Sequence, residues 1–156
     1  HNIIIMIKSS NKVYDPFDGY SIALKKIEES GIIPTKQRRI LAQLLFQKGN
    51  RHISAEDLFD EVKKEDRKIS MATIYNTLKQ FTNLGLIREI VVDKNKSLYD
   101  TNNKPHYHLY IEDEGKVHDI PTNNINLDLP SIPACLNLHN IDVIVRVRSL
   151  KDNKKS

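Results

Sequence analysis

Apolar side chains recur every three or four positions through the first half of the chain, which is the spacing of amphipathic helices. Four such stretches each begin near a residue type that caps helix N-termini. The pattern therefore predicts four helices in this half. They begin at Asp18 or Ser21, after Thr35, after Ser54 and after Ser70, and they end near Gly31, Gly49, Asp66 and Leu84.

The last predicted helix, Ser70–Leu84, has the most informative polar face. Its apolar residues form one stripe that we expect to pack on a core. Read alone, it is an ordinary amphipathic helix with a mixed polar face. That face is poor in acids, however, and suits base edges, thymine methyl groups and phosphates. Its polar positions are Thr73, Tyr75, Asn76, Thr77 and Lys79.

Alternation of apolar and polar residues replaces the helical spacing after this helix. Leu86–Val92 and Ser97–Asp100 predict two strands, and the polar turn between them predicts a hairpin. Helices that end in a recognition helix and are followed by a two-stranded wing form a winged helix-turn-helix. We expect this DNA-binding domain over residues 16–101.

The remainder of the chain predicts a second, smaller domain of α/β type. His106–Ile111, Lys116–Ile120 and Ile141–Val147 have strand patterns, and prolines between the last two exclude a long helix there. The fold class is therefore α+β. We expect residues 102–105 to be a hinge, residues 106–148 a dimerisation and sensing domain, and residues 149–156 a basic tail. A small sheet with an open edge favours pairing with a second copy.

Composition narrows the classes of partner. The chain of 156 residues has a formal net charge of +4, which permits an acidic partner such as DNA. Its single cysteine, Cys135, excludes an internal disulfide or multi-cysteine zinc cluster within these residues and fits a reducing cytoplasm. No apolar run is long enough for a membrane span, so we expect no membrane partner. We expect residues 1–15, which do not begin with Met, to be an N-terminal extension or a vector remnant.

Two groups of residues are candidates for binding a metal or haem and for contacting DNA. His106 and His108 alternate on one strand, so their imidazoles share a face roughly 6.6 Å apart along the backbone. Such a pair is either a plain surface feature or a ligand set for a divalent metal or haem iron. On the recognition helix, Tyr75 and Asn76 could read bases. Arg38, if it is not merely a solvated helix residue, could hold phosphate together with Lys36 and Lys79.

Several segments together are similar to the ferric uptake regulator family. The motifs are GIIPTKQRRIL (31–41), RHISAEDLFDEV (51–62), ISMATIYNTLKQFTNLGLI (69–87) and KPHYHLYIEDEGKVHDI (104–120). A narrower likeness is to the iron response regulator branch, a haem-linked group of alphaproteobacterial repressors. It is carried by LLFQKGNRH (44–52), YNTLKQFT (75–82), YDTN (99–102), HLYIEDEG (108–115), HDIP (118–121) and DVIVRVR (142–148).

This resemblance implies a homodimeric transcriptional regulator, mainly a repressor, that controls haem synthesis and iron homeostasis genes. Its partners would be a double-stranded DNA operator, a second copy and a haem-delivering enzyme. Its cofactors would be a divalent metal (Fe, Mn or Zn), haem, or both. The implied metal ligands are His52, Asp100, His106, His108 and Asp119, with haem at His106 and His108; the implied DNA contacts are Lys36, Arg38, Thr73, Tyr75, Asn76 and Lys79.

The chain also departs from the family pattern. The first cysteine pair of the family's structural zinc site corresponds to Ile111 and Glu114, so no structural four-cysteine zinc is expected. A basic residue often used in the minor groove corresponds to Ile33. The short Cys-Pro haem motif of some members is missing, because Cys135 lies late in the chain and outside any such motif.

Two further readings of the sequence remain. The alternative within the same family is a metal-dependent peroxide sensor or a manganese or iron uptake repressor. A metal-dependent hydrolase is the alternative from another class. It lacks a general base or nucleophile beside the candidate ligands, so we expect no enzymatic activity.

Overall fold

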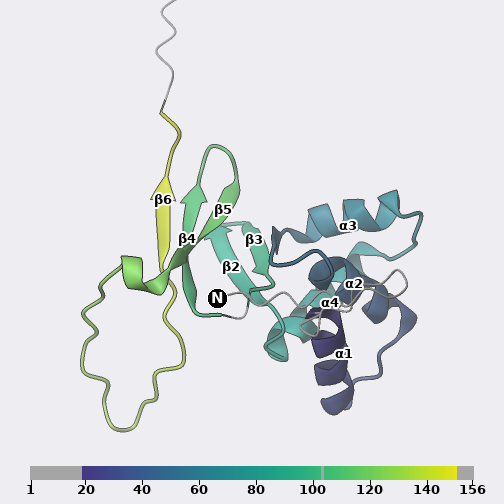
Figure 1. Ribbon diagram of the computed structural model, residues 1–156, viewed down its shortest axis with the longest axis horizontal. Coiled ribbons are helices and arrows are strands. Elements are labelled where there is room, and N and C mark those ends of the chain that lie inside the picture. Colours follow the sequence, from purple (N-terminus) through teal and green to yellow (C-terminus); the bar gives the residue numbers. More distant parts are fainter. Residues whose placement is uncertain (1–18, 103, 151–156) are drawn as a thin grey trace, which may run out of the picture. The chain divides into compact units, whose positions relative to one another are not determined.

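The computed structural model describes residues 19–102 and 104–150, which form two compact units. The first unit contains residues 19–90 and 97–102, and the second contains residues 91–96 and 104–150. The predicted extension 1–15, the alternative helix start Asp18 and residues 151–156 of the predicted tail lie outside the described residues. Figure 1 shows the elements of both units.

The first unit contains four α-helices among its described residues, in the places that the apolar spacing predicts. Thr35, Ser54 and Ser70 act as the predicted N-caps, because each side-chain oxygen accepts the backbone N–H three residues later. Ser21, one of the two predicted starts of the first helix, instead lies inside that helix, which begins at Gly19 among the described residues. At the end of the fourth helix, Gly85 has a φ of 70°, a left-handed conformation that favours glycine. The helices are α1 (Gly19–Glu29), α2 (Lys36–Phe46), α3 (Ala55–Lys64) and α4 (Met71–Asn83).

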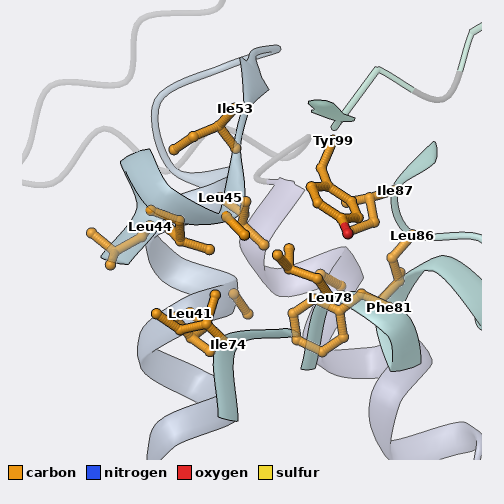
Figure 2. Packing of buried hydrophobic residues seen from close by; sticks show 14 of the residues in the cluster. Leu41, Leu44, Leu45, Ile53, Ile74, Leu78, Phe81, Leu86, Ile87 and Tyr99 are labelled. Carbon is orange, nitrogen blue, oxygen red and sulfur yellow. The ribbon is translucent and has the colours of Figure 1, made fainter. Parts of the chain in front are cut away.

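The apolar faces of these helices share one core (Figure 2). Leu41 and Leu45 of α2 and Ile74, Leu78 and Phe81 of α4 are all almost completely buried. The predicted stripe of α4 thus packs inward, which fixes the direction of its polar face. Leu86, Ile87 and Tyr99 complete the same cluster beside α4.

A three-stranded sheet in the order β1-β3-β2 belongs to the winged domain. Its strands are β1 (His52–Ile53), β2 (Arg88–Asp93) and β3 (Lys96–Asp100). The hairpin was predicted, but β2 begins two residues later than expected because Leu86 and Ile87 are drawn into the core. Strand β1 was not predicted, since two residues are too few to show an alternation. It pairs antiparallel with β3 and sets His52 opposite Asp100.

The second unit is a three-stranded sheet with β4 (His106–Ile111) between β5 (Lys116–Pro121) and β6 (Ile144–Val147) (Figure 1). Strand β5 is antiparallel to β4, whereas β6 is parallel to it. Strand β6 is shorter than the predicted Ile141–Val147. The only helical turn in residues 104–150 is the 3-10 turn Thr122–Asn124, in keeping with the prolines of this region. The α+β fold class is confirmed.

None of the helices in residues 19–102 and 104–150 is both long and apolar enough to cross a membrane.

Candidate metal centre and nucleic-acid interface

The first unit holds two of the predicted metal ligands as a pair. The register of β1 and β3 places His52 directly opposite Asp100, and His52 Nε2 lies 3.4 Å from Asp100 Oδ2. Asp100 is completely buried, and its other oxygen accepts the backbone N–H of Asn102 at 2.8 Å. A buried carboxylate needs polar partners, and here the backbone N–H of Asn102 and the His52 imidazole lie beside its two oxygens.

Strand β1 is anchored by its neighbour Arg51. The backbone N–H of Arg51 donates to Thr101 Oγ1 at 2.9 Å, and the N–H of Thr101 donates to the Arg51 carbonyl at 3.1 Å. The Arg51 guanidinium forms a bidentate ion pair with Glu61 of α3 and also donates to the Leu44 carbonyl of α2. The position of His52 is therefore fixed to the helices of the winged domain.

The second unit holds the other three predicted ligands. His106 and His108 alternate on β4 and are only 6% and 4% exposed, so they are not a plain surface pair. Asp119 lies opposite His108 on β5, and its Oδ1 is 3.4 Å from His106 Nε2. One ligand atom from each of the three lies within 4.8 Å of the others. His118 is exposed, and His139 lies in an exposed irregular segment.

The ring of His106 is oriented by the backbone. Its Nδ1 is hydrogen-bonded to the carbonyl oxygen of Lys104. Because a carbonyl can only accept, Nδ1 carries the proton, and the lone pair of the neutral ring is at Nε2, on the side of Asp119. A backbone partner on the far nitrogen is the usual support for a metal-binding histidine.

These donors fit a divalent ion. Imidazole nitrogens with carboxylate oxygens and no thiolate suit Mn(II), Fe(II) or Zn(II). Haem fits the pair less well, because the two rings lie edge to face on one strand face, with centroids 4.6 Å apart. Two axial histidines must stand on opposite faces of a porphyrin, so the pair in this arrangement cannot both ligate one haem.

The polar face of α4 borders a pocket of about 390 Å³. Five residues of the helix and two residues of the wing line it. The residues are Tyr75, Asn76, Lys79, Thr82 and Asn83 from α4, with Glu89 and Tyr99 from the wing. The three predicted contacts Tyr75, Asn76 and Lys79 are thus brought to one surface.

Thr77 does not belong to this face. It is only 3% exposed, because its position falls on the buried side of α4 between Ile74 and Leu78. Thr73 is partly exposed at the start of the helix, where its hydroxyl lies 2.9 Å from Ser70 Oγ. Ile33, at the position where the family often has a basic residue, is 73% exposed.

Arg38 is partly exposed on α2, and its side chain also bonds α4. Its Nε donates to Gln80 Oε1 of α4 at 3.0 Å, and its Nη1 donates to the Ile33 carbonyl at 2.6 Å. Two hydrogen bonds within the protein therefore hold Arg38, and it is not a freely solvated side chain. Lys36, two residues earlier at the start of α2, is exposed.

Two hydrogen-bond partners of the predicted DNA-contact residues were missed by sequence reasoning. Gln80 bonds Arg38, and Glu56 accepts the hydroxyl of Tyr75 at 2.7 Å. This bond raises the pKa of Tyr75 above its usual value. Burial raises the pKa of the neighbouring Tyr99 to about 12. No sequence spacing signals such a pair, because its members lie on different helices.

Comparison with known proteins gives relatives along most of the chain. The model of the "Ferric uptake regulator family" matches residues 29–147. The peroxide-responsive repressor PerR of Staphylococcus aureus is 29% identical over 104 residues, which cover 67% of this chain and 70% of the relative.

Solved structures of similar fold cover most of the chain as well. The Vibrio cholerae ferric uptake regulator aligns with a TM-score of 0.63 at 22% identity, over 80% of this chain and 98% of its own. A zinc-bound manganese uptake regulator aligns with a TM-score of 0.59 at 26% identity, over 82% and 98%. The matched residues span both units and include all the candidate ligands. The chain belongs to the ferric uptake regulator family, whose members are metal-responsive DNA-binding transcriptional regulators and not enzymes.

Proposed function

We propose that this chain is a repressor whose operator affinity depends on one divalent ion bound by His52, Asp100, His106, His108 and Asp119. The observation that carries the proposal is the buried histidine pair on β4, with Asp119 beside it and the Nε2 lone pair of His106 facing the carboxylate. Three imidazoles and two carboxylates make a donor set that suits Fe(II), Mn(II) or Zn(II).

Chain connectivity supports the joining of the two ligand groups. Asp100 ends β3 and His106 begins β4, so only residues 101–105 separate them. Six extended steps span at most about 20 Å, so the backbone at Asp100 and that at His106 can never be farther apart than this. A bound ion would supply the positive charge that holds all five donors together.

Joining the two units would control DNA binding through geometry. His52 is anchored to α2 and α3 through Arg51, so ligands shared with the second unit fix the orientation of the whole winged domain. In a homodimer formed by residues 106–148, this orientation decides whether two recognition helices can enter successive major grooves.

The DNA contacts follow from the surface of α4. Tyr75 and Asn76, in the first half of the helix, read base edges, and Thr73 and Lys79 border them. Lys36 holds phosphate, and Arg38 does so while it bonds α2 to α4. The partner is therefore a double-stranded operator.

The signal is iron status, through the metal and through haem as in the iron response regulator branch. Haem would compete for His106 or His108, one at a time, and would thereby remove a ligand from the metal set. Loss of repression in the presence of haem follows from that competition. A haem-delivering enzyme would be a partner in this scheme.

Peroxide sensing or manganese control is the second candidate. The likeness to the peroxide-responsive repressor of Staphylococcus aureus and to the zinc-bound manganese uptake regulator favours it. The two candidates use the same five ligands and differ in the stimulus that ends repression.

The test measures DNA affinity of the full chain by anisotropy against a duplex selected from a random pool. We expect Mn(II) or Fe(II) to raise affinity for the duplex about tenfold, because coupling between two binding sites typically changes affinity by about 5- to 150-fold. Haem should then reverse the effect and show a Soret shift. In a variant with both His106→Ala and His108→Ala, the metal and haem effects should disappear, whereas the matched variant His139→Ala should keep both.

Three outcomes discriminate the proposals. Release by hydrogen peroxide but not by haem would favour the second candidate. Haem-triggered release that persists in the double variant would place the sensor elsewhere. A DNA affinity that stays the same with added metal and with added chelator would contradict metal-dependent repression.

A further inference from the structure

One hydrogen bond on the DNA-facing side of the winged domain has no part in forming the core. The hydroxyl of Tyr75, on α4, donates to Oε1 of Glu56, on α3, at 2.7 Å. Tyr75 is 45% exposed and Glu56 is exposed, so the bond lies at the surface that would approach DNA. The residues are 19 positions apart in the sequence and on separate helices.

Glu56 is held as an anion by its place in α3. It lies in the first turn of that helix, directly after the Ser54 cap, where the helix dipole favours negative charge. An ionised carboxylate can only accept hydrogen bonds. The proton between the two residues therefore belongs to Tyr75, and the raised pKa of Tyr75 has this bond as its main cause.

The bond fixes what the Tyr75 side chain can offer to a ligand. Its single hydroxyl proton points to Glu56, so the phenol oxygen presents only lone pairs to anything else. The ring itself borders the pocket that Asn76 and Lys79 share with the wing. A base edge that enters this surface meets an acceptor and an apolar ring, and no donor from Tyr75.

We infer that Glu56 is a positioning residue for sequence recognition, which makes Tyr75 an acceptor for the exocyclic amine of adenine or cytosine in the major groove. The inference rests on the proposed reading of DNA by α4. In the major groove only adenine N6 and cytosine N4 are amine donors, whereas guanine O6 and thymine O4 are acceptors. A free tyrosine hydroxyl would accept all four bases, and the bond to Glu56 removes that tolerance.

The negative charge of Glu56 also affects DNA binding, and its effect can be told apart from the positioning role. An acid near the phosphate backbone weakens binding to every duplex by like-charge repulsion. Removal of Glu56 should therefore raise affinity for random DNA and lower discrimination between sequences. If Glu56 acted through its charge alone, its removal would raise affinity for every duplex and leave discrimination between sequences unchanged.

The experiment uses the full chain loaded with Mn(II) and a duplex selected from a random pool by the unaltered protein. Affinities for this duplex and for random DNA are compared for Glu56→Ala, Glu56→Gln and Asp57→Asn. Asp57 is an exposed acid in the same turn, so its variant controls for charge. Glutamine keeps an acceptor oxygen and controls for the hydrogen bond. Circular dichroism checks that each variant is folded.

We expect Glu56→Ala to lower the ratio of specific to random affinity by about three- to tenfold, the range of one ordinary hydrogen bond. Asp57→Asn should leave the ratio unchanged, and Glu56→Gln should recover part of it. In a Tyr75→Phe background, Glu56→Ala should change the ratio no further. Replacing the recognised adenine by purine, or cytosine by 2-pyrimidinone, should cost as much as Tyr75→Phe and should not add to it.

A Glu56→Ala variant that keeps the discrimination of the unaltered protein would overturn the inference while leaving DNA reading by α4 intact. The same holds if the duplex analogues without the amine bind at full strength. If the unaltered protein selects no sequence from the pool, the proposed function itself fails, and the inference falls with it.

Discussion

At the scale of single residues, the side chains proposed to contact DNA differ in their hydrogen bonds within the protein. Arg38 bonds Gln80 of α4 and the Ile33 carbonyl, while Asn76 is exposed and borders the pocket beside the wing. Substitutions of Arg38 and of Asn76 should therefore affect DNA binding in different ways. Arg38 supports α4 and carries a charge, whereas Asn76 offers an amide that can bond adenine in two places.

We predict that Asn76→Ala weakens binding to a selected operator by about 1–3 kcal/mol and relaxes base preference. Arg38→Ala should weaken binding to selected and random duplexes alike and reduce the slope of affinity against salt. Gln43→Ala, an exposed change later on α2, serves as the neutral control. Anisotropy titrations at several salt concentrations measure all three. Equal losses on both duplexes for Asn76→Ala would contradict base reading by α4.

The candidate site shows which residue-scale features a sequence can reveal. Alternation on a strand was enough to place His106 and His108 on one face, and the structure adds that both are buried. The hydrogen bond from Tyr75 to Glu56 could not be predicted, because it depends on how α3 and α4 pack. The inward turn of Thr77 was missed because a threonine is polar by type, while its place on the helix decides its burial.

At the scale of elements, caps fixed where the helices begin. Ser70 accepts the backbone N–H of Thr73 at 3.1 Å, and its hydroxyl also lies 2.9 Å from that of Thr73. The sequence predicted this start, because serine before a helical apolar stripe is a strong signal. Short strands gave no such signal. Strand β1 exists because β3 offers it a partner, and the paired residues, Ile53 with Tyr99 and His52 with Asp100, are 46 and 48 positions apart in the sequence.

We predict that Ser70→Ala lowers the free energy of unfolding of the winged domain by about 1 kcal/mol, the usual cost of a lost N-cap. Ser70→Asp should retain most of the stability, since aspartate caps helices as well as serine does. Ser131→Ala, in an exposed irregular segment, is the matched control. Urea unfolding followed by circular dichroism measures the change. An unaltered midpoint for Ser70→Ala would mean that packing alone sets the start of α4.

At the scale of the whole molecule, the sequence predicted an α+β chain in which a winged domain precedes a small sheet. The periodicity of both halves carried that prediction, and the family comparison agrees with it. The long segment between β5 and β6 could not be assigned from sequence beyond the absence of a long helix. Its leucines are exposed, at 41% for Leu127, 52% for Leu129, 60% for Leu136 and 55% for Leu138. Several exposed leucines in one segment favour an interface.

We predict a homodimer that forms through residues 106–148 and needs no disulfide. Cys135 is free and exposed, so Cys135→Ser should leave the sedimentation coefficient unchanged in reducing and oxidising buffers. A variant with both Leu136→Glu and Leu138→Glu should shift the protein toward monomer, because charges at an apolar interface lose solvation without gaining a partner. Ser131→Glu adds an acid to the same segment without removing a leucine and should remain dimeric. A protein that sediments as a monomer at micromolar concentration and binds a single half-site would contradict recognition of DNA by the two winged domains of a dimer.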